Sequence, residues 1–120
     1  MQGHQYLTSL ELNNLESLAF KIKLGTKGTR QLQQVLSDPL CLLSNLQLTG
    51  AVLTAKGHSN TAFAIKQSST LISLNLAQND FGPYLNVLLM SQSPLIELNL
   101  SGNNLDDQAM QHVANYLKSA

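Results

Sequence analysis

The feature that most restricts the possible folds of this chain is a pattern of leucines that recurs along it. The most complete copy spans residues 95–105 and reads LIELNLSGNNL. It fits L-x-x-L-x-L-x-x-N-x-L, and residues 71–81 fit the same pattern with Phe81 at the last position. Such a segment predicts a short strand whose alternate leucines point to one side, followed by a turn at the asparagine. Because one copy cannot bury its apolar side alone, the copies must lie against one another.

Two less complete copies of the pattern lie upstream. One has Ala51 in place of the asparagine and consists of Leu43, Leu46, Leu48 and Leu53. The other has a shorter turn without an asparagine and consists of Leu15, Leu18, Phe20 and Leu24. The copies start near residues 15, 43, 71 and 95, so their spacings are 28, 28 and 24 residues.

The segments between the strands carry apolar or small residues in steps of four, which places those residues on one face of a helix. We expect helices at 25–37 and 58–67, the first ended by Asp38-Pro39 because the residue before proline avoids helical geometry. The third segment is one turn shorter, which accounts for the 24-residue spacing. Asp106 or Asp107 is the expected N-cap of a last helix.

These motifs resemble those of ribonuclease-inhibitor-like leucine-rich repeat proteins, the helical subtype also found in nucleotide-sensing receptors and in some secreted bacterial effectors. The resemblance covers Leu15 to Ala120, with Ala51 and the short third helix as departures from the pattern. It implies a right-handed α/β leucine-rich repeat solenoid of about four repeats, with parallel strands on the concave face and helices on the convex face.

The expected domain organisation is an N-terminal cap segment at 1–14 and a leucine-rich repeat domain at 15–120. A solenoid needs a cap because its first repeat would otherwise expose core residues. In an alternative register, Leu7, Leu10 and Leu12 form the first repeat strand, but that strand would lie 36 residues before the next one. Since this spacing falls outside the family range, we favour the cap.

Composition excludes several functional classes. The formal net charge is zero and charged residues make up 12% of the chain, so no basic surface for nucleic acid or for an acidic membrane is expected. His4, His58 and His112 lack the spacing of a metal site, and the single cysteine cannot form a zinc cluster. No G-x-S-x-G or phosphate-loop spacing occurs. We therefore expect no catalytic residues, no metal and no cofactor.

The resemblance predicts a binding function on the concave face, because the positions between the leucines point there. The candidate partner-binding residues are Ser17, Lys21, Asn45, Gln47, Thr49, Ser73, Asn75, Glu97, Asn99 and Ser101. We expect them to bind a protein or peptide, with Ile72 and Ile96 as an additional apolar stripe. The alternative is a structural fragment of a larger leucine-rich repeat receptor or secreted bacterial effector whose function lies in absent parts.

The C-terminal edge of the stack has no evident cap, so self-association through this end is a further expectation. The chain contains no apolar run long enough for a signal peptide or a transmembrane segment. It is therefore expected to be cytoplasmic, or exported as a bacterial effector into a host cell.

Overall fold

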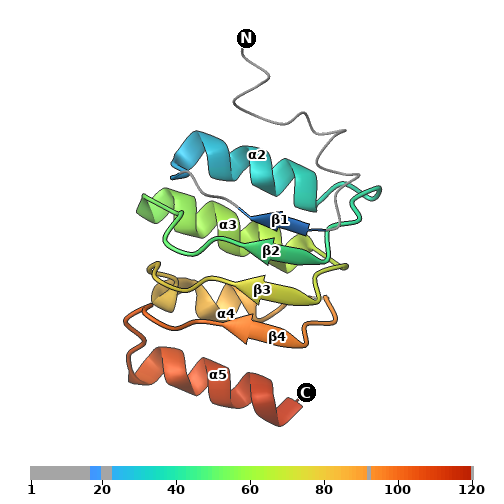
Figure 1. Ribbon diagram of the computed structural model, residues 1–120. Coiled ribbons are helices and arrows are strands. Elements are labelled where there is room, and N and C mark those ends of the chain that lie inside the picture. The colour runs from blue at the N-terminus through green and yellow to red at the C-terminus, as the bar shows by residue number, and fades with distance from the viewer. Residues whose placement is uncertain (1–16, 20–22, 92, 120) are drawn as a thin grey trace.

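Four short strands lie side by side in one parallel sheet. The computed structural model describes residues 17–19, 23–91 and 93–119 (Figure 1). The strands are β1 (Ser17–Ala19), β2 (Asn45–Gln47), β3 (Ser73–Asn75) and β4 (Glu97–Asn99), in that order across the sheet. β1 is described by its backbone, and the other three strands are described with their side chains.

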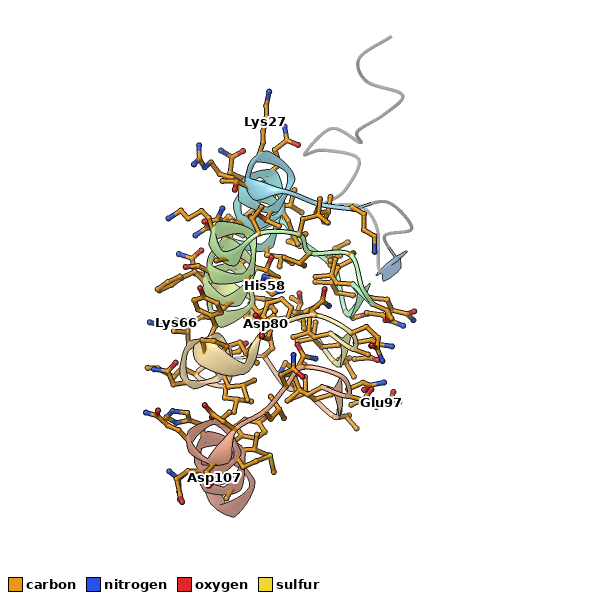
Figure 2. All side chains as sticks on the ribbon, turned by 90° about the vertical axis from the view of Figure 1, so that its left-hand side faces the viewer. Lys27, His58, Lys66, Asp80, Glu97 and Asp107 are labelled. Carbon is orange, nitrogen blue, oxygen red and sulfur yellow. The ribbon has the colours of Figure 1, made fainter. Side chains whose placement is uncertain are left out.

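The helices form a second layer behind the sheet. They are α2 (Thr26–Leu36), α3 (Ala55–Gln67), α4 (Leu85–Leu88) and α5 (Asp107–Ser119), and a 3-10 turn, η2 (Gly82–Tyr84), leads into α4. Figure 2, which views the molecule from the side, shows the helices on the left and the strands on the right. All chain connections between neighbouring strands therefore return through the same layer.

The structure contradicts the predicted fold class. The described residues form a small α/β globule with one open parallel sheet of three-residue strands, not a right-handed solenoid of four repeats with concave and convex faces. The physical reason is the unequal length of the returning segments, since α2 and α3 have 11 and 13 residues whereas α4 has four. A regular solenoid needs equal repeats, because the curve arises from the same small rotation at each step.

The two expected helices are present with shifted ends. α2 lies within the predicted range 25–37. α3 begins three residues before the predicted start at 58 because Thr54 caps it, its hydroxyl accepting a hydrogen bond from the Gly57 N–H at 2.8 Å. Asp106, rather than Asp107, caps α5 by accepting from the Ala109 N–H at 2.8 Å.

The core lies between the two layers and consists mostly of the patterned leucines. Leu46 and Leu74, the middle residues of β2 and β3, are fully buried. The prediction that Leu53 is a core residue is wrong, because its side chain is 58% exposed. Val52 is buried in its place and forms an isolated parallel bridge with Leu24. The turn at Ala51, which has no asparagine side chain, thus shifts the inward position by one residue.

The asparagine at position 79 lies in the turn after β3, as the pattern predicts, and it also holds neighbouring strands together. Its Oδ1 accepts from the Val52 N–H at 3.1 Å, and its Nδ2 donates to the carbonyls of Leu48 and Leu76 at 2.8 and 3.0 Å. Asn103 repeats this arrangement one turn later, accepting from the Phe81 N–H at 2.9 Å. Each buried amide therefore joins its own turn to the preceding one.

Several sequence-based expectations concern residues outside the described part of the chain. These are the cap segment at 1–14 with its alternative register, the positions of Leu15 and Phe20 in the first leucine copy, and the position of Lys21.

Candidate functional site

The polar residues of the strands lie on the side of the sheet that faces away from the helices. β2, β3 and β4 each have a leucine in the middle that points toward the helical layer, whereas the flanking residues are exposed or half-buried. Figure 2 shows Glu97 pointing away from the helices. We call this surface the sheet face and define it by Asn45, Gln47, Ser73, Asn75, Glu97 and Asn99.

Three amides form one line across the sheet face. Gln47 is the register partner of Asn75, and Asn75 is the register partner of Asn99. Because neighbouring strands lie about 4.8 Å apart, the line places successive amide groups within reach of one extended ligand. We call these three residues the amide line.

Asn75 and Asn99 are oriented by their own turns. Asn75 Oδ1 accepts from the Ala77 N–H at 3.0 Å. Asn99 Oδ1 accepts from the Ser101 N–H at 3.0 Å and from the Ser101 hydroxyl at 2.7 Å. These N–H donors identify the oxygen of each amide, so the Nδ2 groups are the ends available to a ligand. The side-chain hydrogen bonds of both residues to other described residues run through Oδ1.

Asn45 differs from the other amides because its oxygen is buried. Its Oδ1 has no hydrogen-bond partner in the described part of the chain, although the residue as a whole is half-buried. A buried acceptor without a donor is uncommon in a folded protein, so this atom is the least satisfied polar group on the sheet face.

An exposed apolar pair borders the sheet face at the start of β3 and β4. Ile72 is 42% exposed and Ile96 is 80% exposed. The two residues are neighbours on adjacent strands, since the Ile96 N–H donates to the Ile72 carbonyl at 2.8 Å. They form the predicted apolar stripe beside the amide line.

The remaining predicted site residues occupy different positions. Thr49 and Ser101 lie in the turns after β2 and β4 and are exposed. Ser17 pairs with Asn45 through the backbone register of β1 and β2. The turn after β2 also has a cation that was not among the predicted site residues, because the exposed Lys23 ammonium donates to the Gly50 carbonyl next to Thr49.

The chemistry of this surface is hydrogen bonding and apolar contact. Among residues 17–19, 23–91 and 93–119, no group of three or more His, Cys, Asp or Glu side chains could hold a metal ion. In the same part of the chain, no helix is long and apolar enough to cross a membrane.

His58, which the sequence shows only to lack metal-site spacing, is a buried structural residue. His58 of α3 is 5% exposed, and its Nε2 accepts from the Asp80 N–H at 2.9 Å while its Nδ1 lies 2.7 Å from the Thr54 carbonyl. Its ring also contacts Phe81 edge-on, with centroids 4.7 Å apart. This histidine joins α3 to the loop after β3, and no local sequence signal reveals it because its partner is a backbone group 22 residues away.

No protein-family model matches the chain, and no curated protein matches its sequence.

Proposed function

We propose that the chain is a protein-interaction module that binds a protein or peptide segment through the sheet face, without catalysis. The observation that carries the proposal is the orientation of Asn75 and Asn99. Each uses its oxygen within its own turn and presents its Nδ2 donor outward. Two pre-oriented donors lose little side-chain entropy on binding, which favours association.

The proposed ligand is an extended segment with hydrogen-bond acceptors and an apolar residue. Backbone carbonyls of such a segment would accept from the two amide donors. Ile72 and Ile96 would cover an apolar side chain of the ligand, and Glu97 would favour a ligand with a nearby cation. The face has no large aromatic anchor, so we expect modest affinity.

The experiment is a peptide-library selection on the native chain, followed by titration of the selected peptides against two variants. Asn75→Asp with Asn99→Asp keeps an oxygen for each turn but replaces both donors by acceptors. Gln34→Glu with Gln108→Glu changes the charge equally at exposed positions on α2 and α5.

We expect the sheet-face variant to raise the Kd by at least about tenfold and the helix variant to leave it within about twofold. Equal loss of binding in both variants, or retention in both, would contradict the proposal. In that case the chain is better described as a structural part of a larger receptor or effector.

The family resemblance and the cellular location stay predictions. The Asn79 and Asn103 turns support a relationship to leucine-rich repeat proteins, because both asparagines occupy the position that the repeat pattern assigns to them. The single buried thiol, Cys41, is compatible with the cytoplasm or with a host cell reached by export.

A further inference from the structure

The charged residues are segregated along the direction in which the strands are stacked. Six of the seven basic residues lie between residues 21 and 66, and only Asp38 is acidic within that range. Four of the seven acidic residues lie between 80 and 107, where no Lys or Arg occurs. Residues 1–66 carry six basic and three acidic side chains, and residues 67–120 carry one basic side chain, Lys118, and four acidic ones, so the net charge of zero conceals two halves of opposite charge.

Each half ends in a group of charges of one sign. The acidic end comprises Glu97, Asp106 and Asp107 at β4 and the start of α5. The basic end comprises Lys23, Lys27 and Arg30 at α2 and the segment before it. Figure 2 shows Lys27 and Asp107 at opposite ends of the molecule.

The acidic end also presents an open sheet edge. Within the sheet, the N–H groups of Leu48 and Leu76 donate to the carbonyls of Asn75 and Asn99 on the next strand, at 2.8 and 2.9 Å. Leu100 holds the corresponding position after β4, and no described residue accepts from its N–H. Unpaired backbone groups along an edge strand favour pairing with another chain.

The side chains at this end are incompletely covered. Leu98 and Leu100 are only half-buried, whereas the corresponding Leu74 and Leu76 of β3 are almost fully buried. Beside them, Ile96 and Met110 are exposed. Covering this surface would remove apolar area from water, which stabilises an interface.

We propose that the acidic end of one copy binds the basic end of a second copy, head to tail. The charges favour this arrangement over a symmetric contact. A symmetric contact between two acidic ends would bring Glu97, Asp106 and Asp107 of both copies together, and like charges at an interface oppose association. A head-to-tail contact instead places each acidic end against a basic one.

The arrangement predicts how the assembly grows. A head-to-tail contact uses two different surfaces, so each added copy leaves a new end and growth continues unless a ring closes. Sedimentation velocity of the full chain from micromolar to millimolar concentration should show a mass that rises beyond that of a dimer. Association should weaken at about 1 M salt, where the screening length falls to roughly 3 Å.

Charge reversal tests the two ends separately. Variant A carries Glu97→Lys with Asp107→Lys, and variant B carries Lys27→Glu with Arg30→Glu. Each variant alone should remain monomeric under conditions in which the native chain associates. An equimolar mixture of A and B should associate again, because each acidic end then meets a basic end.

A matched control changes charge away from the two ends. Lys56→Glu with Lys66→Glu on α3 alters the net charge as much as variant B does and should leave the association constant within about threefold. Circular dichroism of each variant separates a lost contact from a lost fold.

Three outcomes would overturn the proposal. They are a native chain that stays monomeric at millimolar concentration and low salt, a closed dimer as the largest species, or folded variants A and B that do not associate when mixed. Glu97 and Asn99 of β4 belong to the sheet face and border the acidic end, whereas Asn75 of β3 lies away from both ends. Peptide binding by Asn75→Asp alone and self-association of variant B therefore report on the two proposals separately.

Discussion

The middle of the sheet and its C-terminal end carry the same leucine pattern but bury it to different degrees. Leu74 of β3 is 1% exposed, whereas Leu98, its register partner on β4, is only half-buried. β3 has a strand on each side, whereas β4 has a neighbour on one side only. The leucine pattern therefore determines which way a side chain points, whereas a neighbouring strand on each side determines how fully that side chain is buried.

The largest difference in the free energy of unfolding between the two regions should result from truncating these two leucines. Leu74→Ala should lower the free energy of unfolding by about 2 to 5 kcal/mol, because it leaves a cavity in the closed core. Leu98→Ala should cost about 1 to 2 kcal/mol, since part of its side chain is already in water. Urea unfolding of the dilute monomer measures both values, and equal losses would show that the C-terminal end is as closed as the middle.

Both regions contain an asparagine turn, so the same substitution can be made in each. Asn79→Ala should cost about 1 to 3 kcal/mol, since it leaves the Val52 N–H and the Leu48 carbonyl without their partner in the middle of the sheet. Asn103→Ala should cost a similar amount, because Asn103 is also buried and holds the Phe81 N–H. Thermal unfolding monitored by circular dichroism tests this, and a change within error at Asn79 would contradict its role.

A third test concerns histidines on two helices. His58→Leu should cost about 1 to 3 kcal/mol, because the Asp80 N–H then lacks an acceptor and the edge contact with Phe81 is lost. His112→Leu on α5 should change stability by no more than about 0.5 kcal/mol, since His112 is half-buried and outside such a network. If both substitutions had the same effect, His58 would not be a structural link.

The smallest expected effect is at the start of α5. Asp106→Ala removes the N-cap bond to the Ala109 N–H and should cost about 1 kcal/mol. Asp107→Ala removes only a favourable charge in the first turn and should cost about 0.3 to 1 kcal/mol. Guanidinium unfolding distinguishes them, and a larger loss at Asp107 than at Asp106 would show that the cap is assigned to the wrong residue.

Local features could be predicted from the sequence because they depend on spacing alone. The alternation of buried leucines with outward polar residues follows from the two-residue period of a strand. The pattern places Asn79 directly after a strand, where unpaired backbone groups need a partner. The turn at Ala51 was not predicted correctly, since without an asparagine no side chain defines which residue, Val52 or Leu53, turns inward.

The fold class could not be predicted because it depends on how the segments combine. The sequence indicated a shorter third helix, but α4 is only one turn long, and the expected solenoid does not form. On the sheet face, the outward positions of Gln47 and Asn99 follow from the pattern. The bonds that orient Asn75 and Asn99 could not be foreseen, because they depend on backbone geometry after each strand.

The most direct test of the contrast between the two regions is amide hydrogen exchange, measured by NMR on the dilute chain. We expect slow exchange at Leu48 and Leu76, whose N–H groups donate to the next strand, and exchange faster by orders of magnitude at Leu100. Equal protection at all three amides in the dilute monomer would contradict this expectation, because the β4 edge would then already be paired.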